Sequence, residues 1–469
     1  MKVQTDDPRE NLRGASEPRD VKTMRSRRRI VIAGWALLLI FVAVVAWSGG
    51  IQTNARLYQA AYACGFVGFV LLIRVVAWRS DVTGVGRWGW WLLGCILIRV
   101  ALIGTQPSDD LYRCVWEGRV QVAGHNPYAH APNSDELIDL RDDTWHLINH
   151  PDYPAIYPPI AQVQFAALAL LQPSIHLLKA MHVVWDVLVV VVLGSCLRNR
   201  GLPPHGAIVY GLCPLVISAF AVEGHVDSLM LLFIALAVHS MGRKRIVLAG
   251  AMLGAAVAAK TTAIVFVPWL IIRHPRAAGA AIGVVVACYL PYAAAGTGLF
   301  ESVLRFTRES EFFSLLAALG IADFETESSR RLIGFVLAGV LLFLALRRRE
   351  FTRFALPAAE MTVVLIPIVH YWYLTMVVMF VTFHRRWCWI AAAAAMVVYF
   401  EAERARSRTG TWSMPVWVPV TVWGVLGAAF VIEWFARRIE TGARAAHTPA
   451  SEWPSGGRGC GNQREDRLG

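Results

Sequence analysis

Two adjacent carboxylates, Asp109 and Asp110, open a polar stretch that follows three apolar runs. Ser108 precedes them and an amphipathic run follows, which predicts a helix with acidic residues at its N-terminus. On that helix Asp110, Arg113 and Glu117 are three and four positions apart, so they share one face. A solvated interfacial helix with one ion pair is the alternative. Paired carboxylates at a membrane boundary are costly, however, and indicate a site for proton transfer or for a divalent cation.

A second polar stretch, INHPDYPAIYPPIAQ, brings Tyr157 to the start of the apolar run that begins at Pro159. His146 and His150 are four positions apart and could share a helix face, but no carboxylate is placed with them. The cysteines have no spacing typical of metal ligands or of a redox pair. We therefore predict no His or Cys metal site, and only the paired carboxylates leave divalent-metal dependence open.

The composition indicates a membrane protein. Of 469 residues, 56% are hydrophobic and 17% are charged, whereas soluble domains average about 45–50% apolar and about 25% charged residues. Apolar runs of spanning length recur along most of the chain. The net charge of +12 comes from basic clusters in short loops, which act as topology signals rather than as a nucleic-acid surface. We predict an all-α, polytopic transmembrane helical bundle with membrane lipids, and no nucleic acid, as partners.

Basic clusters predict the orientation of the chain. The polar segment 1–29 ends in a run of arginines before the first apolar run, so the N-terminus is expected in the cytoplasm. Two further crossings place the stretch 105–158 outside. The later basic clusters all fall inside if the short run 159–171 is re-entrant or interfacial instead of spanning. The predicted spans are 30–47, 57–77, 88–104, 176–197, 206–222, 227–241, 246–259, 261–273, 277–295, 331–346, 356–370, 371–383, 387–400 and 414–436.

This scheme gives about 12–14 crossings with both termini cytoplasmic. The pairs 246–273 and 356–383 consist of short halves and could be partial hairpins. A transmembrane domain then occupies residues 30–436, and its long extracytoplasmic loop, 105–158, carries interfacial helices. The tail, 437–469, is rich in Gly, Arg and Ser and is expected to be a disordered cytoplasmic segment.

The same scheme places unusual polar residues on one side of the membrane. Any one of them could simply cap a helix, but eight on the outer side indicate a site. Tryptophans near span ends, Trp372 among them, are instead expected in interfacial aromatic belts. The eight outer residues are Asp109, Asp110, Glu223, His225, Asp227, Lys260, His370 and Tyr371.

These segments resemble a known family. The patterns SDDLYRCVWEGRVQVAGHNPY, INHPDYPAIYPPIAQ, EGHVDSLMLLF and AAVAAKTTAIVFVP look like those of bacterial GT-C integral-membrane glycosyltransferases. The nearest group is related to glycosyltransferase family 87 and to the polyprenol-phosphate-mannose-dependent mannosyltransferases. The resemblance covers roughly residues 30–435. One departure is that the family's core pattern has one span before the long loop, whereas three precede it here.

The resemblance implies a function and a base. In that family an acidic residue of the first long outer loop is the general base, and Asp110 matches it by its distance to the Asn-Pro-Tyr turn; Asp109 is its neighbour. The chain would move a sugar, mannose by resemblance, from a polyprenyl-phosphate donor to an envelope lipid or glycan acceptor on the extracytoplasmic face, with inversion. Its membrane would be the bacterial cytoplasmic, or inner, membrane.

The leaving phosphate of such a donor needs cationic groups, and outer-side residues could provide them. Other polar residues would orient the sugar or the acceptor. Since no Gly-rich phosphate loop follows a strand, no nucleotide-sugar site is expected. The phosphate-binding candidates are Arg113, Lys260, His225 and His370, and the orienting candidates are Glu117, Asp227 and Tyr157.

Two other classes of protein fit a polytopic chain. A secondary transporter or lipid flippase would require internal repeats and broken helices with polar residues at the midplane. The sequence has no evident repeat, and its polar residues collect at one face. A non-catalytic assembly subunit would tolerate replacement of the loop carboxylates.

Overall fold

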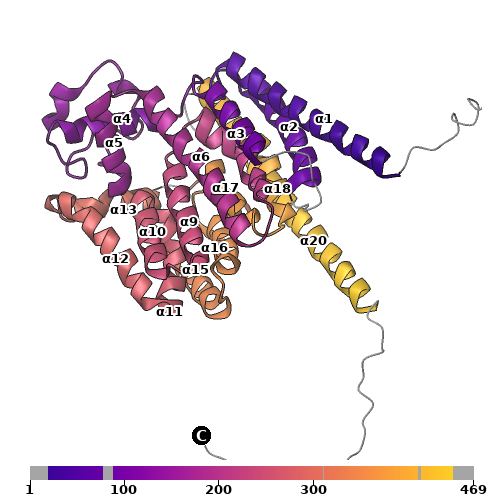
Figure 1. Ribbon diagram of the computed structural model, residues 1–469. Coiled ribbons are helices and arrows are strands. Elements are labelled where there is room, and N and C mark those ends of the chain that lie inside the picture. The colour runs from indigo at the N-terminus through magenta and orange to yellow at the C-terminus, as the bar shows by residue number, and fades with distance from the viewer. Residues whose placement is uncertain (1–18, 78–87, 310, 410–413, 447–469) are drawn as a thin grey trace, which may run out of the picture.

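The computed structural model describes residues 19–77, 88–309, 311–409 and 414–446. Helices make up the fold (Figure 1). Within the described residues the only β-pairing is an isolated parallel bridge between Phe312 and Ile368. The predicted all-α, polytopic bundle is therefore confirmed.

The α-helices number twenty among the described residues. They are α1 (Arg19–Ser48), α2 (Ala55–Leu72), α3 (Trp88–Leu102), α4 (Asp110–Val122), α5 (Pro159–Leu171), α6 (Ile175–Asn199), α7 (Ile208–Gly211), α8 (Pro214–Ile217), α9 (Asp227–Gly242), α10 (Ile246–Ala259), α11 (Val267–Arg273), α12 (Pro275–Tyr289), α13 (Gly298–Glu309), α14 (Leu315–Ala318), α15 (Glu327–Arg347), α16 (Phe351–Leu365), α17 (Leu374–Val381), α18 (Trp387–Ala395), α19 (Glu401–Thr409) and α20 (Trp417–Ala446). Short 3-10 or π turns extend or join them: η1 (Ile73–Ala77), η2 (Asp135–Leu140), η3 (Trp145–Leu147), η4 (Pro204–Ala207), η5 (Ser218–Val222), η6 (Thr261–Phe266), η7 (Leu290–Ala295), η8 (Tyr371–Tyr373) and η9 (Met396–Phe400).

Every predicted span coincides with helix, but the helices differ in length. Among the described residues, six helices are long and apolar enough to cross a membrane alone: Thr23–Ser48, Ala55–Ala77, Ile175–Asn199, Pro275–Ala295, Glu327–Arg347 and Trp417–Ile439. The pair Pro204–Gly211 and Pro214–Val222 bends by 62°. The remaining spans are shorter apolar helices, so the number of crossings stays a prediction.

The sequence prediction did not include the helices α13, α14 and α19 or the C-terminal part of α20. The helix α13 was not predicted, because its apolar residues alternate with charged ones and form no apolar run. The helix α20 continues to Ala446, into the segment expected to be a tail; residues 447–469 lie outside the described part. The re-entrant candidate 159–171 is the helix α5, and whether it crosses the membrane stays a prediction.

Small residues let several helices pack closely. A Cβ at Gly118 of α4 would lie 2.2 Å from the carbonyl oxygen of Phe165, so α4 rests directly on α5. Gly250 and Gly254 of α10 face the backbone of α12 in the same way, a spacing common where membrane helices meet. These contacts fix α4 and α10, two of the helices whose ends enter the site described below.

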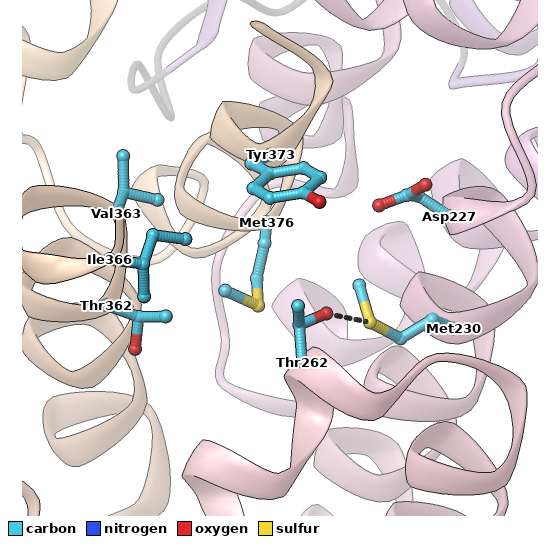
Figure 2. A pocket seen from close by; sticks show the side chains of 8 residues that line it. All are labelled: Asp227, Met230, Thr262, Thr362, Val363, Ile366, Tyr373 and Met376. Atoms are coloured by element: carbon cyan, nitrogen blue, oxygen red, sulfur yellow. Dashed lines mark hydrogen bonds between the residues drawn. The ribbon is translucent and has the colours of Figure 1, made fainter. Parts of the chain in front are cut away.

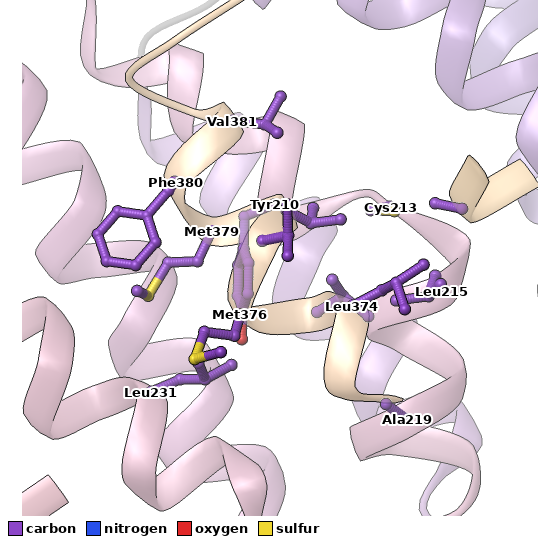
Figure 3. Packing of buried hydrophobic residues seen from close by; sticks show 14 of the residues in the cluster. Tyr210, Cys213, Leu215, Ala219, Leu231, Leu374, Met376, Met379, Phe380 and Val381 are labelled. Atoms are coloured by element: carbon purple, nitrogen blue, oxygen red, sulfur yellow. The ribbon is translucent and has the colours of Figure 1, made fainter. Parts of the chain in front are cut away.

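The core surrounds α17, in which every residue is buried. Figure 3 shows side chains of α17 packed against Tyr210 and Leu215 from the bent α7–α8 pair. Tyr210 also donates a 2.7 Å hydrogen bond to Asp186 of α6. Asp186 pairs with Arg99 of α3 at 2.5 Å, and both side chains are 0% exposed. Charges this deep are costly unless paired, so the contact locks α3, α6 and α7 together.

Candidate active site

The polar residues expected on the outer side gather where helices are interrupted. The N-terminus of α4, the turn between η5 and α9, the break between α10 and η6, and the segment before α17 meet at one place. Lys260, for example, adopts an extended conformation (φ −154°, ψ 128°) between α10 and η6. Helix ends leave backbone groups unpaired and cannot carry a continuous apolar surface, so polar side chains concentrate there.

Asp110, the first residue of α4, is the centre of a hydrogen-bond network. Asn149 donates to its carboxylate at 2.6 Å, and the Tyr157 hydroxyl lies 3.5 Å away. His225 Nδ1 lies 3.6 Å from the same group. Burial acts to raise the pKa of Asp110, but His225, Asn149 and the charge of Lys260 together hold the pKa below its ordinary value. The lowered pKa favours the ionised form of Asp110 at neutral pH.

His225 links two carboxylates and is almost completely buried. Its Nε2 lies 3.0 Å from Glu223, which also accepts a hydrogen bond from the Tyr371 hydroxyl. Burial alone would lower the pKa of His225, but Asp110 and Glu223 raise it to about 9. The imidazole is thus a cation at neutral pH, held between Asp110 and Glu223.

A stack of aromatic rings extends from His225. Trp372 lies parallel to it at 3.7 Å between ring centroids, and His370 stacks on the other side of Trp372 at 4.3 Å. Phe312 follows at 5.1 Å from His370. His370 Nδ1 is 2.8 Å from the Tyr399 hydroxyl. The stack fixes the orientation of both imidazoles relative to Asp110.

Lys260 forms a second charged contact in the same place. Its ammonium group lies 2.5 Å from Asp227, the first residue of α9, and 5.1 Å from the Tyr373 ring centroid. The positive charges of Lys260 and His225 both act on the Asp110 carboxylate. Asp110, His225, Asp227, Lys260 and His370, all predicted from sequence, are therefore parts of one cluster.

Asp109 differs from its neighbour in its contacts. It pairs with Arg406 of α19 at 3.0 Å, and Arg406 also lies 3.9 Å from Glu403. Burial, and then the negative charge of Asp110, raise the pKa of Asp109. The two adjacent carboxylates thus have opposite pKa shifts, a pattern typical of sites that separate ionised and protonated carboxyl groups.

Arg113 and Glu117 are placed differently from the sequence expectation. Arg113 donates to Glu117 and to the carbonyl oxygens of Asn149, His150, Tyr153 and Pro154, which uses all five of its N–H groups. Glu117 accepts a further bond from Gln162 at 2.5 Å. These bonds leave Arg113 no free N–H for a phosphate. The pair instead holds the 149–154 loop, and through Asn149 it positions Asp110.

Several residues of the site were not predicted from sequence, among them Asn149, Arg406, Trp372 and the aromatic residues Phe312, Tyr373 and Tyr399. Asn149 and Arg406 are polar residues in irregular or amphipathic segments that carry no distinctive spacing. Trp372, expected in an interfacial belt, is sandwiched between two histidines instead. Its position in the run His370-Tyr371-Trp372-Tyr373 was the one available signal.

An apolar pocket adjoins the cluster (Figure 2). Asp227 and Tyr373 form its polar end, next to Lys260. Figure 2 shows Val363 of α16 and Ile366, the residue that follows this helix, on the side opposite Met230 and Thr262. The pocket therefore runs from a charged pair into apolar surroundings between α9, η6, α16 and α17.

The fold and this cluster define a class: a multi-pass helical membrane protein with an ionised carboxylate beside buried cations at interrupted helix ends. Within the described residues, no group of three or more His, Cys, Asp or Glu side chains is arranged to hold a metal ion. The cluster can accept a proton at Asp110 and bind an anion near Lys260 and His225.

The sequence model of the alpha-(1->6)-mannopyranosyltransferase family, for its N-terminal domain, matches residues 30–274, just over half of the chain. The chain therefore belongs to this mannosyltransferase family, as the motif resemblance predicted, and is a membrane glycosyltransferase. The match includes Asp110, His225 and Lys260. It does not favour a transporter or flippase. No curated protein matches the chain significantly.

Proposed function

We propose that the chain transfers mannose from a polyprenyl-phosphate donor to an envelope lipid or glycan on the extracytoplasmic face of the bacterial inner membrane. The observation that carries this proposal is the position of Asp110: an ionised carboxylate with His225 and Lys260 beside it and an apolar pocket next to the lysine. A lipid-phosphate sugar has parts that match this order: the sugar corresponds to the carboxylate, the phosphate to the cations and the lipid tail to the apolar side. It consists of a sugar, an anionic phosphate and an apolar tail.

Asp110 acts as the general base. The acceptor hydroxyl attacks the anomeric carbon of mannose, its proton passes to the Asp110 carboxylate, and the bond from that carbon to the phosphate oxygen breaks. The leaving group is polyprenyl phosphate. One displacement inverts the configuration and requires only one base. Asn149 and Tyr157 hold the carboxylate. We assign Asp109, anchored by Arg406, to orienting the acceptor.

Lys260, His225 and His370 stabilise the charge that develops on the leaving phosphate. Lys260 is anchored by Asp227, which also borders the apolar pocket of Figure 2. The apolar residues Met230, Val363 and Ile366 lie on the side of Lys260 from which we expect the polyprenyl tail to extend; the cavity between them, about 10 Å³, is too small to enclose the tail itself. Placing the phosphate at the polar end of this pocket brings the sugar to the Asp110 side.

The test compares Asp110→Asn with Asp143→Asn, the same substitution at an exposed position of the same loop. Purified protein in lipid receives radiolabelled polyprenyl-phosphate mannose and an envelope acceptor pool. We expect Asp110→Asn to reduce transfer by roughly 10²–10⁴-fold and Asp143→Asn to leave it unchanged. Both variants should elute and melt as the wild type does.

Near-normal transfer by a folded Asp110→Asn variant would remove Asp110 as the base. If Asp109→Asn alone abolished transfer, the base would be its neighbour. If the wild type used another lipid-linked sugar instead, the proposed donor would be wrong while the assignment of the base could still hold.

A further inference from the structure

A buried histidine of α6, which the proposed reaction does not use, lies directly behind the turn that carries His225. The side chain of this residue, His182, is 0% exposed. Its Nδ1 lies 2.6 Å from the carbonyl oxygen of Gly224, the residue before His225. Its Nε2 lies 2.7 Å from the side-chain nitrogen of Gln164 in α5. The ring is therefore held by α5 on one side and contacts the turn of the site on the other.

The donors and acceptors around His182 allow one arrangement of protons. The indole of Trp185 can only donate, and it donates to the side-chain oxygen of Gln164 at 2.7 Å. The amide nitrogen of Gln164 then faces His182 and donates to Nε2, so Nε2 carries no proton. The proton of the neutral ring is on Nδ1, which donates to the Gly224 carbonyl. A doubly protonated ring would place two donors 2.7 Å apart.

The turn at Gly224 has little freedom on its other sides. Gly224 has φ +79°, a conformation that favours glycine. A Cβ at this position would lie 3.0 Å from a side-chain carbon of Leu111 and 3.1 Å from one of Lys179. The backbone N–H of His225 donates to the Ala219 carbonyl at 2.9 Å. Both polar atoms of the peptide group that leads into His225 are thus bonded, the carbonyl oxygen to the imidazole of α6 and the N–H to Ala219.

The direction of this peptide group decides where the His225 ring lies. The ring reaches Asp110 at 3.6 Å and Glu223 at 3.0 Å while it stacks on Trp372 at 3.7 Å between centroids. Hydrogen bonds weaken steeply with distance and angle, so contacts made together at these distances tolerate little rotation of the backbone that carries the ring. A peptide group without its partner in α6 could rotate and carry the imidazole away from both carboxylates.

We propose that His182, as the neutral Nδ1–H tautomer, is a positioning residue that holds the Gly224 carbonyl and thereby keeps His225 between its two carboxylates. The inference rests on the proposed function, in which the cationic His225 assists transfer. His182 acts through the turn and not on the reacting atoms.

The charge of His225 also depends on the other ionisable groups that face it or its two carboxylates. Because His182 is neutral, replacing it removes no charge from this set, so a change in the pKa of His225 would report a change in its position. The groups come from α4, the turn itself, α6, the break after α10 and the segment before α17: Asp110, Glu223, Lys179, His182, Lys260, His370 and Tyr371.

The test compares His182→Ala with His182→Asn in the transfer assay in lipid. The Asn amide nitrogen can take the place of Nδ1 and donate to Gly224, whereas Ala has no donor. We expect His182→Ala to lower kcat/KM about tenfold. Its alkaline decline, which follows the His225 pKa of about 9, should begin about one pH unit lower, because a histidine away from its carboxylates loses its charge sooner. His182→Asn should keep most of both properties, and His146→Ala, at an exposed position of the loop, should change neither.

A measurement without donor separates this inference from the proposed function. NMR of protein with isotope-labelled histidine, in nanodiscs, reports which ring nitrogen is protonated and the pH at which each imidazole titrates. The signals of His182 and His225 are those lost in His182→Asn and His225→Gln. The Nδ1–H tautomer at His182, with a lower titration midpoint of His225 in His182→Ala, supports the inference even if mannose transfer fails. The Nε2–H tautomer at His182, an unchanged midpoint of His225 in a folded His182→Ala variant, or equal losses of activity in the Ala and Asn variants would overturn it.

Discussion

At the residue scale, the chemistry depends on how one histidine is held. His225 bridges Asp110 and Glu223 and stacks on Trp372, so its charge and orientation are both fixed. Burial by itself acts to raise the pKa of Asp110, and His225, together with Asn149 and the charge of Lys260, lowers it below its ordinary value. The histidine therefore favours the ionised form of Asp110, the proposed base.

The pH dependence of transfer should show this arrangement. Asp110, whose pKa is lowered, stays ionised as pH falls, so kcat/KM should not fall between about pH 8 and pH 5 through loss of the base. His225, with its pKa raised to about 9, loses its charge above that pH, and kcat/KM should decline there. In His225→Gln this alkaline decline should disappear, together with a lower overall rate. An unchanged alkaline limb in the variant would show that another group titrates.

At the element scale, close helix contacts place the site. The break at Lys260 follows α10, whose Gly250 and Gly254 lie against the backbone of α12. Because α10 cannot slide along α12 without losing this contact, the position of Lys260 along the axis of α10 is fixed, and Lys260 stays beside Asp227. The α13 helix has a similar effect on the loop: Arg305 pairs with Asp152 at 2.8 Å, and Ser302 donates to the Pro154 carbonyl.

Alanine substitutions should distinguish a glycine that contacts the neighbouring helix from a glycine that has open space beside it. A Cβ at Gly250 would lie 2.1 Å from the Ala277 carbonyl oxygen, whereas a Cβ at Gly279 of α12 meets no atom within 4 Å. Gly250→Ala should therefore destabilise the protein by about 1–3 kcal/mol, seen as a lower melting temperature in detergent, with reduced transfer. Gly279→Ala should melt as the wild type does. Equal melting temperatures for the two variants would mean that α10 and α12 do not pack this closely.

At the scale of the whole molecule, contacts between distant segments sort into two sides, as the proposed topology requires. Segments expected outside contact one another: Asp109 pairs with Arg406, and Asp152 pairs with Arg305. Segments expected inside also meet, as in the ion pair between Arg200 and Glu350 at 2.9 Å. Arg305 and Arg406 were not among the basic clusters from which the topology was predicted. Their contacts with Asp152 and Asp109 are therefore independent support for grouping these segments on one side of the bundle.

Labelling of introduced cysteines tests the orientation. Asp143→Cys, in the loop proposed to be extracytoplasmic, should react with a membrane-impermeant maleimide in intact spheroplasts. Arg243→Cys, in the connection between α9 and α10, should react only after the membrane is permeabilised. The wild type, with its native cysteines, sets the background. The reverse pattern would place the site on the cytoplasmic face and remove the lipid-linked donor from the proposal.

The sequence by itself determined the class, the helices and most of the charged cluster. Spans are apolar runs, and lipid leaves a chain few other structures, so composition and basic clusters suffice to predict an all-α bundle. Asp110, His225 and Lys260 could be selected because a charge beside an apolar run is expensive and therefore conspicuous. The motif resemblance then led to the family, which the family match confirmed.

Only the tertiary structure decided how these residues are used. Arg113 looks like an anion-binding residue until its five bonds to Glu117 and the loop carbonyls are seen. Asn149, Trp372 and Arg406 enter the site from segments far apart in the chain, and no local pattern records such contacts. Spacing along the chain reports which residues share a helix face, whereas partners across the fold depend on packing between helices.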